Sequence, residues 1–164
     1  MENATIRPAT SAEGPFLQRM LAIAADWRPG SVVRSVEEVL AEPKLAHYVL
    51  GWPRAGDFGV VASDDDGRLV GAAWCRFFTA DDPGFGFVSS EVPEVSLGVV
   101  SGFRRRGVGR QLMVGLVDEA RSRGIGRLSL SVEVDNPAMD LYAELGFVPV
   151  ADADGAATMV LDLG

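Results

Sequence analysis

The chain has 164 residues, of which 48% are hydrophobic and 23% charged, and it carries a formal net charge of −8. This length and composition predict one domain over residues 1–164, and a single cysteine excludes a disulfide scaffold. The acidic balance argues against nucleic-acid and anionic-membrane partners, and no apolar stretch is long enough to cross a bilayer. The N-terminal residues lack a signal pattern, so we expect a cytoplasmic protein.

The first half of the sequence predicts a strand, two helices and a hairpin, in that order. Ser35 is placed to cap the second helix, and Pro43 should divide that helix into two pieces. An Asp–Gly pair between two β-rich runs is typical of an antiparallel hairpin. The elements are expected at residues 5–9, 16–23, 36–50, 58–62 and 68–78. The segment 79–93, rich in Pro, Gly and acids, is a loop long enough to cover a binding site.

The second half predicts a strand–helix–strand–helix unit followed by a terminal hairpin. These elements are expected at residues 95–100, 109–123, 127–134, 136–145, 147–150 and 158–163. The order indicates a mixed α+β fold in which one curved sheet has helices packed on its faces.

The segment from Arg104 to Gly109 predicts an anion site between a strand and a helix. Two glycines let a ligand approach the backbone, and the first turn of the helix directs unpaired N–H groups and its positive dipole end toward the same place. The Walker and Rossmann patterns do not fit, because the chain's single lysine is Lys44 and a third glycine is missing. A basic helix N-terminus without a ligand is the competing interpretation.

The distribution of charge supports an anionic ligand near this segment. Residues 104–127 hold seven arginines against Asp118 and Glu119, a balance of +5, so the rest of the chain carries −13. This asymmetry suits an anionic cofactor on one side and an amine-bearing substrate on the other, although acidic surfaces also serve solubility alone.

Two blocks of sequence together resemble the Gcn5-related N-acetyltransferase (GNAT) superfamily. Arg104, Gly107 and Gly109 match its Gln/Arg-x-x-Gly-x-Gly/Ala motif, and residues 136–147 are similar to its Asn…Ala…Leu-Tyr…Gly-Phe segment. The resemblance spans nearly the whole chain. It implies the acyl-CoA N-acyltransferase fold, a curved, mixed, mostly antiparallel sheet flanked by helices.

The resemblance also implies acetyl-CoA as co-substrate. Its pyrophosphate would lie on backbone N–H groups of Arg104, Arg105, Arg106, Gly107, Val108, Gly109 and Arg110. The pantetheine arm would pair with the strand backbone at Leu97 and Val99, unless that strand is fully paired in the sheet. Asn136 is the expected polar partner of the pantetheine or acetyl end. No metal is expected with one His, one Cys and no cluster of ligands.

Direct acetyl transfer to an amine needs a general acid and a general base. Tyr142 matches the family tyrosine and is the expected acid, the alternative being a core tyrosine. For the base, Glu133 and Glu94 are both candidates, and strand alternation favours Glu133 by placing it on a polar face. A water relay is a further alternative. His47, the chain's one histidine, is expected to be structural more than catalytic.

Acceptor choice should come from the first two helices and the loop at 79–93. These segments mix aromatic and acidic side chains, which suit an amine but also describe an ordinary loop anchored by its aromatics: Trp27, Trp52, Phe85, Phe87, Asp81, Asp82 and Glu91. The sequence does not choose among polyamine, amino acid, antibiotic, metabolite and protein N-terminus.

The leading hypothesis is an acetyl-CoA-dependent N-acetyltransferase acting on a primary amine of a small molecule or peptide. A non-catalytic acyl-CoA-binding or sensor domain of the same fold is the alternative, and an interaction domain without ligand is a third. A homodimer stays open, since dimers are frequent in the superfamily. The excess of arginine over lysine is typical of high-GC bacteria.

Overall fold

The computed structural model describes residues 4–103 and 107–164. Its strands are β1 Thr5–Pro8, β2 Phe58–Ser63, β3 Leu69–Arg76, β4 Glu94–Val99, β5 Arg127–Glu133, β6 Val148–Ala153 and β7 Ala156–Asp162. Its helices are α1 Gly14–Ala25, α2 Val36–Leu40, α3 Pro43–Ala46, α4 Val108–Ser122 and α5 Ala138–Glu144. Short 3-10 helices, η1 Ser11–Glu13 and η2 Ser101–Phe103, precede α1 and follow β4.

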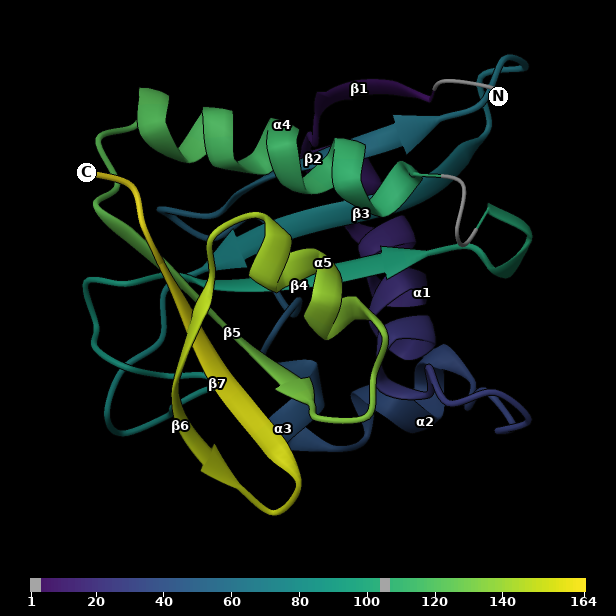
Figure 1. The fold of residues 1–164 in the computed structure, drawn as a ribbon. Coiled ribbons are helices and arrows are strands. Elements are labelled where there is room, and N and C mark those ends of the chain that lie inside the picture. Colours follow the sequence, from purple (N-terminus) through teal and green to yellow (C-terminus); the bar gives the residue numbers. More distant parts are fainter. Residues whose placement is uncertain (1–3, 104–106) are drawn as a thin grey trace.

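All seven strands form one curved sheet in the order β1-β2-β3-β4-β5-β7-β6 (Figure 1). Neighbouring strands are antiparallel except β4 and β5, which are parallel. The predicted mixed, mostly antiparallel sheet with helices on its faces is therefore confirmed.

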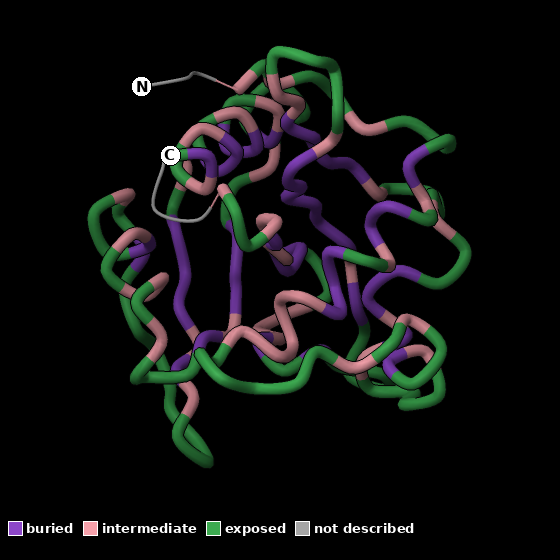
Figure 2. The backbone as a smooth tube through the Cα atoms, turned by 90° about the vertical axis from the view of Figure 1, so that its right-hand side faces the viewer, coloured by how far each residue is buried: buried purple, intermediate pink, exposed green. Residues whose placement is uncertain are grey.

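Each face of the sheet is covered by one long helix. Successive strand residues point to opposite faces, and the apolar residues on each face pack against a different helix. Leu112 and Leu116 of α4 belong to the same buried cluster as Val60 of β2. Val61, the residue after Val60 on β2, belongs to the other buried cluster together with Leu17 of α1. Figure 2 shows the buried residues gathered in the interior segments and the exposed ones along the connections.

Glycine lets α1 lie close against β4. A Cβ on Gly98 would stand 2.5 Å from the Met20 carbonyl oxygen, so a side chain at this position would push the helix away. The close approach places the C-terminal end of α1 beside the carboxyl end of β4.

Local sequence signals explain where the helices begin. Ser35 caps α2 as predicted and forms a capping box with Glu38. Pro43 is the first residue of α3, so the predicted second helix is divided there. The 3-10 helix η1 begins with a capping box formed by Thr10 and Glu13. Within the described residues, no helix is both long and apolar enough to cross a membrane.

Candidate active site

The site begins where β4 and β5 separate. These two strands pair at one register position, Glu94 with Ser129, and the Ser129 N–H donates to the Pro93 carbonyl at 3.1 Å. Beyond this point they diverge toward their C-terminal ends (Figure 1). The divergence leaves an edge of β4 open in the middle of the sheet.

Backbone alternation decides which groups of β4 face this opening. The Val100 N–H donates to the Val70 carbonyl on β3 at 2.8 Å, so the even-numbered residues of β4 bond to β3. The N–H of Leu97 consequently points away from β3, toward the opening. The prediction that β4 offers backbone groups to a ligand fits this geometry at Leu97.

One hollow on this side, here the Gly109 groove, runs from β4 to the start of α4 and has a volume of about 580 Å³. Several of the predicted cofactor residues line it: Leu97, Val99, Gly107, Gly109, Arg110 and Asn136. Gly107 precedes α4 with a φ of 82°, a left-handed conformation that favours glycine. Val108 is buried in the core, so only its backbone is available to a ligand. Arg104, Arg105 and Arg106 lie outside the described residues.

Two polar side chains of the groove are already engaged. Arg110 pairs with Glu144 of α5, and Asn136 Oδ1 accepts from the Ala138 N–H at 2.9 Å at the start of that helix. The Asn136 side-chain amide nitrogen therefore remains as the donor that this residue can offer a ligand.

A second hollow, here the Glu94 cavity, has a volume of about 660 Å³ and lies between α1, α3, β4, β5 and the β6–β7 hairpin. Its lining includes Glu94, Glu133 and Tyr142. Leu97, Asn136 and Tyr142 line the groove as well as the cavity, so the two hollows meet at these residues.

Tyr142 occupies this junction from α5 and is 8% exposed. Burial raises the pKa of its hydroxyl well above the ordinary value, so the group is protonated near neutral pH. A protonated hydroxyl at the junction of both hollows can donate a proton to a leaving group.

Glu94 is the buried carboxyl group of the cavity, at 3% exposure. Burial raises its pKa to about 7, opposed by a hydrogen bond from the Tyr48 hydroxyl to Oε2. In the part of the chain that the structure describes, Oε1 has no hydrogen-bond partner. A carboxyl group that titrates near neutrality and has an unpartnered oxygen suits proton transfer.

Glu133 has a different environment, although it lines the same cavity. Its side chain is 49% exposed and pairs with Arg28 at 2.9 Å, and Arg28 also pairs with Asp135 at 2.6 Å. Alternation along β5 does place Glu133 on the polar face, but at the strand's end that face is open to solvent. The geometry thus favours Glu94, where sequence alternation favoured Glu133.

The loop at 79–93 passes directly over Glu94. The Phe85 N–H donates to the Tyr48 hydroxyl at 2.8 Å, and a Cβ on Gly84 would lie 2.1 Å from Glu94 Oε1. On the far side, a Cβ on Gly86 would lie 2.5 Å from the Leu130 carbonyl carbon. The two glycines allow the loop to bury the carboxyl group.

The predicted acceptor residues divide into two groups. Trp27 and Phe85 line the Glu94 cavity, and Phe85 is 59% exposed. The remaining predicted residues are not among those that line it: Trp52, Phe87, Asp81, Asp82 and Glu91. Trp52 instead donates to the Thr10 carbonyl at 3.0 Å, and Asp82 pairs with His47. His47 is thus held in a structural contact, and its ring packs against Tyr48 and Phe78.

Tyr48 is the residue that sequence reasoning missed. It lies 46 positions before Glu94, and no motif links the two. A tyrosine before two apolar residues, Val49 and Leu50, was the available signal, but it fits a core residue equally well. Across the described ranges, no group of His, Cys, Asp and Glu is placed to hold a metal.

The family model for the acetyltransferase (GNAT) family matches residues 19–147. Because this match covers most of the sequence, the chain belongs to the GNAT acetyltransferase family. Among curated protein sequences, none matches the chain.

Solved structures share the fold. A ribosomal-protein-alanine N-acetyltransferase from Brucella melitensis is 26% identical, over 96% of this chain and 99% of that one, with a TM-score of 0.68. A phosphinothricin acetyltransferase from Sinorhizobium meliloti, in complex with acetyl-CoA, is 21% identical over 98% and 89%, with a TM-score of 0.72. An N-acetyltransferase from Staphylococcus aureus Mu50 is 19% identical over 99% of both chains, with a TM-score of 0.70.

Proposed function

We propose that this protein transfers an acetyl group from acetyl-CoA directly to a primary amine of a small molecule or peptide. The observation that carries the proposal is the meeting of the two hollows. A carboxyl group with a pKa of about 7, Glu94, lines the cavity on one side of Leu97, and the protonated Tyr142 lies where this cavity joins the groove. A base and an acid therefore face one reaction centre.

The residues of the Gly109 groove fit a coenzyme A thioester. Leu97 offers a backbone N–H, Asn136 offers an amide nitrogen, and the start of α4 offers the N–H groups of a helix N-terminus. The acetyl thioester, when bound, would supply an activated carbonyl group. The role predicted for Arg104, Arg105 and Arg106 in holding its phosphates remains a prediction.

Three groups of the chain would share the chemistry. Glu94 takes a proton from the amine while the amine nitrogen bonds to the acetyl carbonyl carbon and the carbon–sulfur bond breaks. Tyr142 gives its proton to the departing thiolate. Glu94 then releases a proton to solvent and Tyr142 regains one, so the protons balance. The Leu97 N–H would stabilise the negative charge that develops on the carbonyl oxygen.

The acceptor end of the cavity suits an amine. Trp27 and Phe85 offer aromatic surface on which a cation can rest before it loses its proton. Because Glu94 must be ionised to act as a base, kcat/KM for the acceptor should rise with pH through about 7.

The test is release of free thiol from acetyl-CoA in the presence of a panel of primary amines. We expect turnover with at least one amine, and we expect Glu94→Gln to lower kcat/KM about 100-fold or more. Tyr142→Phe should lower kcat with little change in CoA affinity, because it removes the acid and leaves the groove intact. Wild-type turnover in both variants would overturn the assignment.

The same experiment separates the non-catalytic alternative. A sensor or binding domain would be stabilised by acetyl-CoA in thermal unfolding. It would release no thiol with any amine, and Tyr142→Phe would change nothing that the assay measures.

A further inference from the structure

Tyr48 connects the loop at 79–93 with Glu94. Its hydroxyl donates to Glu94 Oε2 and accepts from the Phe85 N–H at 2.8 Å, and the residue is 6% exposed. Burial raises the pKa of the Tyr48 hydroxyl far above its ordinary value, so this donor keeps its proton wherever Glu94 titrates.

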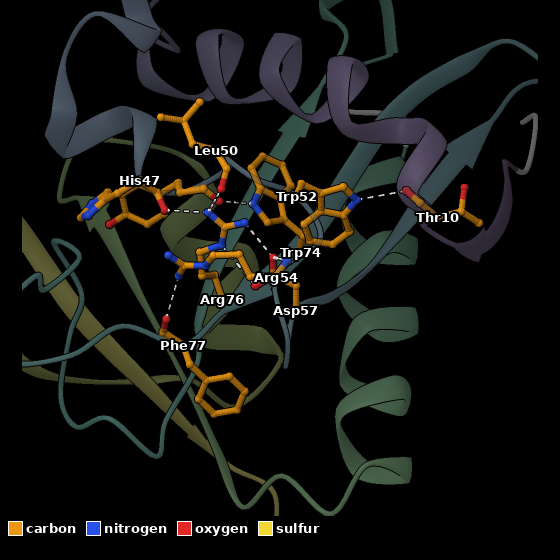
Figure 3. Close-up of polar contacts among 10 residues, drawn as sticks. Thr10, His47, Leu50, Trp52, Arg54, Asp57, Trp74, Arg76 and Phe77 are labelled. Atoms are coloured by element: carbon orange, nitrogen blue, oxygen red, sulfur yellow. Dashed lines mark hydrogen bonds and ion pairs between the residues drawn. The ribbon is translucent and has the colours of Figure 1, made fainter.

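The backbone around Tyr48 is fixed by two side chains of β3 (Figure 3). The Trp74 indole N–H donates to the Tyr48 carbonyl at 2.9 Å. Arg76 donates to the carbonyls of His47 at 3.0 Å and Leu50 at 2.7 Å. We call Trp74, Arg76 and Asp57 the β3 clamp.

Asp57 holds the guanidinium group of this clamp. It accepts from Arg76 at 2.7 Å, and both side chains are 1% exposed. The buried ion pair thus holds the backbone on either side of Tyr48 through the carbonyls of His47 and Leu50, and the Tyr48 hydroxyl in turn donates to Glu94. A flexible tyrosine at the surface would have no such constraint.

We infer that Tyr48 is a positioning residue for the proposed acetyl transfer: its hydrogen bond to Oε2 fixes the orientation of the Glu94 carboxyl group that takes the proton from the amine. The inference rests on the proposed role of Glu94 as the base. Tyr48 itself touches no reacting atom in this scheme.

The hydrogen bond should also set the pH at which the base becomes available. Burial raises the pKa of Glu94, and two hydrogen bonds lower it by stabilising the charged carboxylate, the larger effect from the Tyr48 hydroxyl and the smaller from the Gly86 backbone. Without the Tyr48 donor, the ionised carboxylate would lose a partner in a buried site. The pKa of Glu94 should then rise above about 7.

Several other charged groups line the Glu94 cavity, namely Arg34, Glu42, Lys44, Glu133, Asp152 and Asp154, but Tyr48 is the side chain that donates a hydrogen bond to the Glu94 carboxyl group. On β3, Arg76 is committed to Asp57, and burial raises the pKa of the Cys75 thiol, which stays neutral. Behind Tyr48, His47 bonds to Asp82 of the loop. On β5, the nearest register partner is Ser129, which carries no charge. Tyr48 is therefore the contact to remove.

The experiment compares pH profiles of kcat/KM for wild type, Tyr48→Phe and Glu94→Gln, with the best amine of the panel. In Tyr48→Phe, we expect the midpoint of the acidic limb to move from about pH 7 to about pH 8. Glu94→Gln should abolish this limb, and adding Tyr48→Phe to it should cause no further change. Phe78→Leu, which alters packing against the Tyr48 ring, is the matched control and should leave the midpoint in place.

A second variant and a second readout keep the test independent of folding and of turnover. Trp74→Phe removes the indole donor but keeps the Tyr48 hydroxyl, and it should move the midpoint in the same direction by less. Infrared titration of the Glu94 carboxyl, assigned by its loss in Glu94→Gln, should show the same order of midpoints.

The outcomes distinguish two failures. A fully active Glu94→Gln enzyme with an unchanged limb would overturn the proposed function. A Glu94-dependent limb that stays at the same pH in Tyr48→Phe and in Trp74→Phe, with an unchanged infrared midpoint, would overturn the inference about Tyr48 alone.

Discussion

The Gly109 groove and the Glu94 cavity meet at the same residues but are built in different ways. The groove consists of strand backbone, the start of one helix and small or apolar side chains. The cavity depends on side-chain hydrogen bonds between Tyr48, Glu94, Arg76 and Asp57, which are far apart in the sequence. The β4–α4 side of the groove is therefore specified by residues close in sequence, with α1 and α5 completing its lining, whereas the cavity depends throughout on contacts between distant residues.

The first prediction concerns the buried ion pair between Asp57 and Arg76, which holds the backbone around Tyr48. Asp57→Ala leaves the Arg76 guanidinium, 1% exposed, without its carboxylate, so we expect the free energy of unfolding to fall by about 3–5 kcal/mol. Urea unfolding measures this change. Asp66→Ala, which removes an exposed pair with Arg68, is the control and should have little effect. Equal stability of the two variants would show that the clamp does not hold this region.

The second prediction concerns how stability depends on pH. Because the pKa of Glu94 is raised from 4.5 to about 7, the folded chain holds this proton more tightly than the unfolded chain. The contribution is fully present below about pH 4.5 and is lost as pH rises to about 7, a loss on the order of 3 kcal/mol. Unfolding free energies measured at about pH 4.5, 6 and 8 should show this loss in wild type and not in Glu94→Gln.

Glu13 provides a control of opposite sign. A hydrogen bond from Arg7 lowers its pKa to about 2, so its contribution to stability is present above about pH 4.5 and is lost as pH falls. Glu13→Gln should therefore destabilise the protein at neutral pH, where Glu94→Gln should stabilise it. The same direction of change in both variants would contradict the assigned environments.

Much of the fold could be predicted from local signals. The Asp64–Gly67 turn, the cap at Ser35 and the break at Pro43 each lie where the sequence indicates. The last hairpin is longer than predicted, since β6 runs to Ala153 and β7 begins at Ala156. Asp154 and Gly155 both have positive φ, which allows a tight two-residue turn and lets the strands continue up to it.

In the candidate site, too, the residues in local motifs could be predicted and those that depend on distant contacts could not. Groove residues such as Gly109 and Asn136 could be found from motifs, because strand, turn and helix follow one another in the chain. The environment of Glu94 could not, because its burial depends on Gly84 and Gly86 crossing it and on Tyr48 reaching it. Alternation reports which face a residue takes, and this is why Glu133 seemed the better base from sequence.

The third prediction tests the covering loop. Gly84→Ala would place a Cβ 2.1 Å from Glu94 Oε1 and 2.8 Å from the Tyr48 hydroxyl, so the loop or the carboxyl group must move. We expect kcat/KM to fall about 100-fold, because displacement of a catalytic group by about 1 Å costs that much. Gly126→Ala is the control, since its Cβ would meet no atom within 4 Å. Equal kcat/KM in the two variants would show that the loop does not fix Glu94.

The smallest expected effect comes from the groove, where glycine is not required by the protein itself. A Cβ on Gly109 would make ordinary contacts, 3.6 Å to Leu141 and 3.8 Å to Leu97, in a helix that alanine favours. Gly109→Ala should therefore keep or slightly raise stability and, since the family motif accepts Gly or Ala at this position, change acetyl-CoA affinity by no more than about threefold, or about 0.7 kcal/mol. Calorimetric titration with acetyl-CoA measures the affinity, with Gly126→Ala as the matched variant. A loss of tenfold or more (about 1.4 kcal/mol) in Gly109→Ala would contradict the alignment of Gly109 with the Gly/Ala position of the motif, because it would mean that the ligand tolerates no Cβ at this turn.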